Sequence, residues 1–129
     1  MKVIEQTRIY PVDITIVWNI ISNLSRSDWV PGVERITLKE DTRIFEMQGM
    51  GDLVERIIKC DSETKELHYS AIKTQAPINH HLAKIKLENF EGKTKFIWST
   101  EIDPEIFSDA IEKSMIASLD QLAEVLKES

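Results

Sequence analysis

The stretch DPEIFSDAIEKSMIASLDQLAEVL, from Asp103 to Leu126, decides the fold of this chain of 129 residues. Pro104 fits the first turn of a helix, where a missing backbone N–H leaves no helical hydrogen bond unmade. Apolar residues then recur every three or four positions, as on one face of a helix. They form a broad stripe of Ile106, Phe107, Ala110, Ile111, Met115, Leu119, Leu122, Ala123 and Leu126. A stripe this wide has to be buried, so the remainder of the chain must provide a second layer.

The segment from residue 33 to residue 102 provides that layer. Its apolar residues alternate with polar ones at a period of two, which is typical of strands with one buried face. Turn residues separate the alternating runs at short intervals, so consecutive antiparallel hairpins are favoured. The predicted strands lie at residues 36–38, 45–47, 53–60, 67–71, 81–87 and 96–102.

The N-terminal part of the chain predicts one more strand and two short helices. Residues 2–10 alternate at their start and end at Pro11, as a strand that leads into a turn. Asp13 is a good N-cap for a first helix, and residues 25–29 fit a second one. We therefore predict an α+β fold, in which a seven-stranded curved antiparallel sheet wraps around a long helix at residues 105–127.

Several local features follow one another in a fixed order. They are Val17-Trp18, Trp29-Val-Pro-Gly32, the run Gly51-Asp-Leu-Val-Glu-Arg-Ile57 with Asp61 after it, Tyr69, Pro77 four residues before His81, and a Trp98 strand that ends at Asp103-Pro104. In this order the chain resembles the helix-grip superfamily, the SRPBCC or START-like proteins. It looks most like small bacterial polyketide cyclase/dehydrase-like proteins. The resemblance covers residues 1–129 as a single ligand-binding domain, and it implies a cavity between sheet and helix for an apolar or amphipathic small molecule.

Composition narrows the range of partners. The net charge of −6 argues against nucleic acid, because gripping a phosphate backbone needs an excess of Lys and Arg. Cys60 is the only cysteine, so no intramolecular disulfide can form. We see neither a signal peptide nor an apolar run of membrane-spanning length. The expectation is a cytoplasmic protein that does not span a membrane and uses no cofactor; nothing in the sequence specifies a protein partner.

The adjacent histidines His80 and His81 raise the question of a metal site. Successive side chains of a strand point to opposite faces, so the two rings diverge, and no further ligand spacing accompanies them. We expect no metal site. His81 shares a face with Ile85, whereas His80 shares a face with Lys84, so the alternation predicts that His81 points inward and His80 outward.

Polar residues among the inward strand positions mark the candidate site. Glu55 shares one face of its predicted strand with Leu53 and Ile57. The resemblance to abscisic-acid receptors implies that its carboxylate faces the ligand. His81 can donate and accept a hydrogen bond when neutral. Glu34 and Lys59 are weaker candidates. The predicted ligand-binding set is Glu55, Ile57, Tyr69, Ala71, His81, Ala83, Ile85, Trp98, Phe107, Ile111 and Met115.

Each polar candidate also has a purely structural explanation. Glu55 can pair with Lys59 or with another basic group on the sheet, because buried carboxylates need partners. His81 can be a hydrogen-bonded histidine at the start of a strand. Trp18 and Trp29 are expected to pack the short helices against the rest of the fold rather than to contact a ligand.

Two main functions remain open on this sequence, beside a weaker third one, a partner-dependent module that acts on a larger membrane or electron-transfer complex. The first is binding or transport of a hydrophobic metabolite such as a lipid, an isoprenoid, a quinone or an aromatic polyketide. The lack of a nucleophile, base and orienting group in sequence favours it. The alternative is an enzyme of the polyketide cyclase/dehydrase type, in which Glu55 or His81 transfers a proton. No catalytic residue is assigned.

Overall fold

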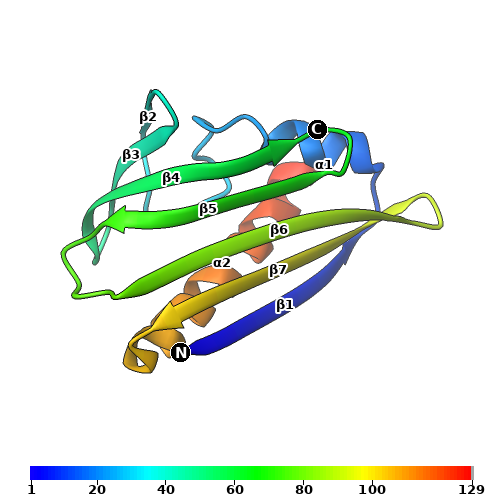
Figure 1. Ribbon diagram of the computed structural model, residues 1–129. Helices are drawn as coiled ribbons and strands as arrows, with labels where there is room; N and C mark the ends of the chain where they lie inside the picture. Colours follow the sequence, from blue (N-terminus) through cyan, green and yellow to red (C-terminus); the bar gives the residue numbers. More distant parts are fainter. Residues whose placement is uncertain (129) are drawn as a thin grey trace.

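The computed structural model describes residues 1–128 and forms a curved antiparallel sheet with a long helix across one face (Figure 1). The elements in chain order are β1 (Lys2–Tyr10), α1 (Ile14–Ile21), β2 (Ile36–Lys39), β3 (Thr42–Met47), β4 (Gly51–Asp61), β5 (Glu66–Lys73), β6 (His80–Phe90), β7 (Lys93–Asp103), a 3-10 turn η1 (Glu105–Phe107) and α2 (Ser108–Lys127). The strand order is β1-β7-β6-β5-β4-β3-β2, so only β1 pairs with a strand that does not follow it in sequence. The predicted helix-grip fold is confirmed.

Alternation along the strands builds the core. On β7, every second side chain is buried, including Phe96, Trp98 and Ile102. The facing stripe of α2 buries Leu119 and Leu122 completely. Each such apolar side chain contributes roughly 1.5–3 kcal/mol when it leaves water, so the alternating strands and the striped helix stabilise each other.

Polar contacts to β1 set the position of α2. The hydroxyl of Tyr10 donates a hydrogen bond to the backbone carbonyl of Leu119 at 2.7 Å. Arg8 Nη1 lies 2.8 Å from a carboxylate oxygen of Asp120. These contacts hold one side of α2 at the β1 edge of the sheet. The opposite side of α2 covers the space above β4 and β5.

One predicted helix is absent. The stretch from residue 22 to residue 32 consists of turns instead of a second short helix at residues 25–29. Side chains in this stretch bind the local backbone and one another. Ser27 Oγ donates a hydrogen bond to the carbonyl of Glu34 at 3.0 Å, and Arg26 Nε lies 2.7 Å from a carboxylate oxygen of Asp28. So short a segment cannot offset the entropy of helix nucleation when such local alternatives exist.

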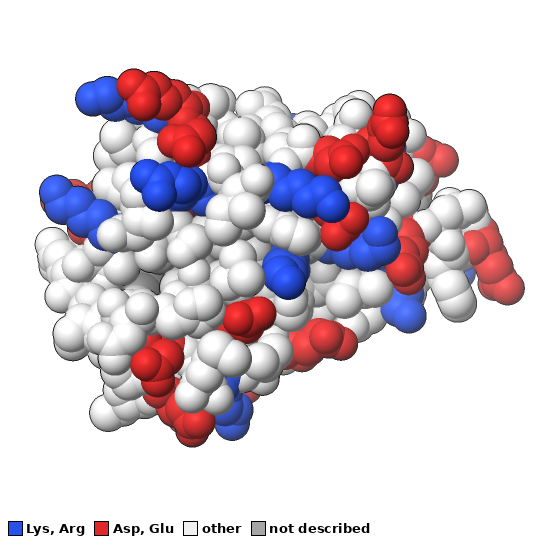
Figure 2. Space-filling model, viewed as in Figure 1, with Lys and Arg blue, Asp and Glu red and all other residues white. Residues whose placement is uncertain are grey.

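The outer face of the sheet carries charges of both signs, interspersed along the strands (Figure 2). Ion pairs account for part of this pattern, including Arg56 of β4 with Asp41 in the β2–β3 turn at 3.4 Å and His80 of β6 with Glu101 of β7 at 3.0 Å. Within the described part of the chain, no helix is both long enough and apolar enough to cross a membrane.

Candidate functional site

A cavity of about 130 Å³ lies between the sheet and α2. Side chains from β2 to β7, from the loop before β2 and from α2 line it, and most of them are apolar. An engineered cavity of about 150 Å³ in another protein holds one benzene molecule, so this space matches a single ring. Three methionines in its wall, Met47, Met50 and Met115, can repack around a larger molecule because their side chains are flexible.

Most of the predicted site residues line the cavity, namely Glu55, Tyr69, Ala71, His81, Ile85, Trp98, Ile111 and Met115. The other predicted residues do not. Ala83 is buried in the core beside the cavity, and Ile57 and Phe107 pack at the edge of that core. Glu34 is exposed in the loop before β2, because the strand begins after it.

Arg43 is the main residue that the sequence analysis missed. It is 7% exposed and lies directly across from Glu55 in the β3–β4 pairing, with Nη2 2.7 Å from Glu55 Oε1. The guanidinium carbon also lies 4.7 Å from the centre of the Tyr69 ring, within range of a cation–π contact. The predicted strand began at Phe45, three positions too late; the shared parity of Arg43 with Phe45 and Met47 was the available signal.

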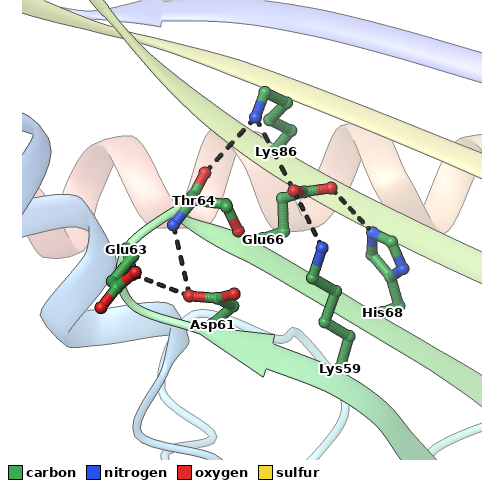
Figure 3. A network of polar contacts seen from close by, with 7 residues as sticks. All are labelled: Lys59, Asp61, Glu63, Thr64, Glu66, His68 and Lys86. Carbon is green, nitrogen blue, oxygen red and sulfur yellow. Dashed lines mark hydrogen bonds and ion pairs between the residues drawn. The ribbon is translucent and has the colours of Figure 1, made fainter.

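Lys59 does not face the cavity, and a β-bulge is the reason. The β4–β5 register shifts between Ile57 and Lys59, which turns Lys59 to the outer face of the sheet. There it joins the polar network in Figure 3, where Lys59 Nζ lies 3.1 Å from Glu66 and His68 Nε2 lies 3.2 Å from the same carboxylate. The hydrogen bond from Lys59 and a second one from Thr64 lower the pKa of Glu66 to about 2. This network is separate from the cavity.

The Arg43–Glu55 pair is a neutral but polar element in an apolar wall. Burial raises the pKa of Glu55, and the Arg43 guanidinium opposes that rise by stabilising the carboxylate. Burial, and then the charge of Glu55, raise the pKa of Tyr69, so its phenol is neutral near neutral pH. The polar end of the cavity therefore combines an ion pair with a neutral hydroxyl.

His81 fills a gap between two strands. Regular β5–β6 pairing extends only from Glu66 opposite Lys86 to Tyr69 opposite Ala83. Beyond it, His81 Nδ1 accepts a hydrogen bond from the backbone N–H of Ala71 at 2.8 Å, in place of a backbone carbonyl. In the neutral ring, Nε2 then carries the proton.

The two histidines occupy different surroundings, as the alternation predicts. His81 lies in the wall of the cavity, and burial lowers its pKa to about 4, with a smaller effect from His80. The side chain of His80 is 44% exposed and contacts Glu101 on the outer face. Among residues 1–128, no cluster of three His, Cys, Asp or Glu side chains could hold a metal ion.

We expect His81 to make stability depend on pH. As the pH falls below 6.5, an unfolded histidine takes up a proton, whereas buried His81 stays neutral until about pH 4. The free energy of unfolding should therefore decrease over this interval, by at most about 3 kcal/mol from this residue. In His81→Asn, whose side-chain oxygen can still accept from Ala71, urea unfolding at a series of pH values should show a flatter profile.

His80→Ala is the matched control and should keep the wild-type pH profile. Parallel profiles for wild type and His81→Asn would mean that His81 is protonated as easily in the folded state as in the unfolded state.

Comparison with known proteins agrees with the architecture. A family model described as polyketide cyclase / dehydrase and lipid transport matches residues 1–128. A structurally similar, uncharacterised protein from Bacillus thuringiensis has a TM-score of 0.86 at 16% identity, over 96% of this chain and 98% of that chain. A protein from Thermobifida fusca has a TM-score of 0.81 at 23% identity, over 96% and 92%. The Zhui aromatase/cyclase from a Streptomyces species has a TM-score of 0.83 at 12% identity, over 98% and 93%. No curated protein matches the chain.

Proposed function

The chain belongs to the polyketide cyclase/dehydrase and lipid-transport family, and on that premise we propose that it binds a small apolar or amphipathic molecule in the cavity beneath α2. The observation that supports this most is the wall of the cavity, which is largely apolar and includes a polar cluster of Arg43, Glu55 and Tyr69. Small-molecule sites are usually built in this way, with apolar surface for affinity and a few polar groups for orientation. The volume favours a ring-sized ligand, such as the head of a quinone or an aromatic polyketide, over a long acyl chain.

Native mass spectrometry of protein purified from its own source tests the proposal. A ligand held in the cavity should appear as a reproducible mass increment under mild ionisation, and extraction into organic solvent should remove it. Purified protein should also bind ethylbenzene saturably, with shifts of the methyl NMR signals of cavity residues such as Ile85 and Ile111. Absence of an increment in several preparations, together with no response to ethylbenzene, would overturn the proposal.

Filling the cavity should abolish this binding. Ala71 lies in the cavity wall, so Ala71→Leu places a larger side chain in the space that the ligand needs. We expect loss of ethylbenzene binding by at least about tenfold, since one aromatic ring and a leucine side chain are of comparable size. Ala117 is exposed on α2, and Ala117→Leu adds the same atoms outside the cavity. Titrations followed by NMR should show wild-type affinity for this control; equal loss in both variants would place the binding site elsewhere.

An enzyme of the cyclase/dehydrase type is the second candidate, and Glu55 is the observation in its favour. A buried carboxyl group with a raised pKa in a cavity wall suits proton transfer. The contact with Arg43 counts in the opposite direction, because the guanidinium stabilises the carboxylate and makes it a weaker base. His81 is less suited than Glu55, since its Nδ1 is already occupied by the backbone of Ala71.

Deuterium exchange distinguishes the two candidates. If Glu55 removes and returns a proton next to a bound carbonyl, the protein should accelerate deuterium uptake into the methyl group of acetophenone in heavy water. Glu55→Gln should then reduce the rate about a hundredfold or more, because the amide cannot accept the proton. If the protein binds acetophenone but deuterium uptake is no faster than in buffer alone, the protein binds the ligand without transferring its proton.

A further inference from the structure

Two buried hydrogen-bond donors at the cavity have no acceptor. Among residues 1–128, Arg43 Nε and Trp98 Nε1 are the buried side-chain nitrogen or oxygen atoms without a hydrogen-bond partner. The two residues are 7% and 6% exposed, and both line the cavity. A buried donor left unpaired costs roughly 1–3 kcal/mol, and native structures leave few of them. An acceptor supplied by a ligand would remove that cost.

Both donors lie beside Tyr69, at the same end of the cavity. The Arg43 guanidinium stacks over the Tyr69 ring while its Nη2 is engaged by Glu55, so Nε is the group left over. Burial raises the pKa of the Tyr69 hydroxyl and the nearby Trp98 indole slightly opposes that rise, so Trp98 also lies beside Tyr69; its Nε1 has no hydrogen-bond partner. One ligand oxygen at this end could therefore accept from either donor or from both.

The charges around the two donors determine whether the ligand oxygen is neutral or negatively charged. Glu55 already neutralises Arg43 at 2.7 Å, and the neighbouring Tyr69 and His81 side chains are uncharged. A ligand carboxylate would therefore bring an uncompensated negative charge next to Glu55 in a buried site, which is strongly unfavourable. A neutral oxygen can accept the same hydrogen bonds without adding charge.

We propose that the ligand presents a neutral carbonyl oxygen, of a ketone, an ester or a quinone, to Arg43 and Trp98. The proposal rests on the proposed binding function and adds the chemical class of the ligand. In this proposal, Arg43 and Trp98 make the protein bind oxygen-containing molecules more tightly than pure hydrocarbons. Glu55 serves in this arrangement to hold Arg43 and to exclude anions.

Three probes of nearly equal size test the proposal. Acetophenone carries a neutral carbonyl oxygen, ethylbenzene has none, and benzoate carries a negative charge. By NMR titration at neutral pH, acetophenone should bind about tenfold more tightly than ethylbenzene, since a hydrogen bond from a charged or buried donor is worth about one such factor. Benzoate should bind more weakly than acetophenone. In the infrared spectrum, the carbonyl stretch of bound acetophenone should shift to lower frequency than in an apolar solvent.

Conservative variants assign the effect to each donor. Trp98→Phe removes the indole N–H and keeps an aromatic ring, and Arg43→Lys keeps a cation for Glu55 and removes Nε. Each should reduce the preference for acetophenone over ethylbenzene, measured as the ratio of the two affinities in the same variant, by about threefold or more. The carbonyl stretch should move back toward its apolar-solvent frequency in parallel.

The outcomes separate this proposal from the one on which it rests. Binding of none of the probes would overturn the binding function itself. Equal affinities for acetophenone and ethylbenzene in the wild-type protein would leave the binding function in place and overturn the carbonyl proposal. Benzoate as the tightest probe would overturn the choice of a neutral oxygen. An unchanged preference in both variants would remove Arg43 and Trp98 from the assignment.

Discussion

Leu119→Asp is expected to unfold the protein. Leu119 lies in the middle of the buried stripe of α2 with 0% exposure, and its backbone carbonyl accepts the hydrogen bond from Tyr10. An aspartate here would place a carboxylate in the core without a partner, at a cost of several kcal/mol. That is comparable with the whole stability of a typical domain, about 5–15 kcal/mol. Circular dichroism should show no cooperative thermal transition and a reduced helix signal.

Ile116→Asp is the matched control on the same helix. Ile116 is 38% exposed, so its replacement introduces the same charge and the same helix propensity at the surface. It should melt within a few degrees of the wild-type protein, since exposed substitutions usually change stability by less than about 0.5 kcal/mol. A Leu119→Asp variant that melts as the control does would contradict the packing of α2 on the sheet.

Breaking the buried ion pair is expected to have the second largest effect. Arg43→Leu leaves the carboxylate of Glu55 buried without its partner, and such losses cost about 3–5 kcal/mol. The double variant Arg43→Leu, Glu55→Leu replaces both charges by apolar groups and should recover most of that loss. Urea unfolding at neutral pH measures the free energy of unfolding of each protein. A double variant no more stable than the single one would show that the pair is stabilised by more than mutual neutralisation.

The pH dependence of Arg43→Leu provides an independent check. Without Arg43, burial alone acts on Glu55 and raises its folded-state pKa further above the unfolded value. The folded state of the variant then binds a proton more readily than the unfolded state does, so its deficit should be largest at high pH and shrink as the pH falls through the folded-state pKa. Urea unfolding at pH 7 and pH 5 should show this narrowing relative to the double variant. A deficit that grows on acidification would contradict the assignment of Glu55 as the stranded charge.

The outer network suggests why Glu55 of β4 and Glu66 of β5 behave differently. Glu66 lies at the surface among Lys59, Lys86 and His68, and its pKa is lowered. Glu55 is enclosed, and burial raises its pKa although Arg43 lies beside it. Solvent and several cations stabilise one carboxylate, whereas burial dominates for the other, although both lie on neighbouring strands.

The sequence by itself determined the architecture and the direction of most inward side chains. A stripe with helical periodicity and a series of runs with period two can both be buried only if the helix lies on one face of the sheet. The same parity separated His81 from His80, because turning His80 inward would have buried Lys84 and exposed Ile85. These features are local and repeat over many residues, so each position supports the next.

Only the tertiary structure decided the partners at the polar end of the cavity. The pairing of Arg43 with Glu55 depends on the register of β3 against β4, and the outward turn of Lys59 depends on one bulge. Register and bulges follow from the packing of the whole sheet, and a shift of a single residue reverses the face of every side chain beyond it. The unpaired donors of Arg43 and Trp98 likewise arise only when strands distant in sequence enclose one space, since a lack of partners is a property of the folded surroundings and not of the residues themselves.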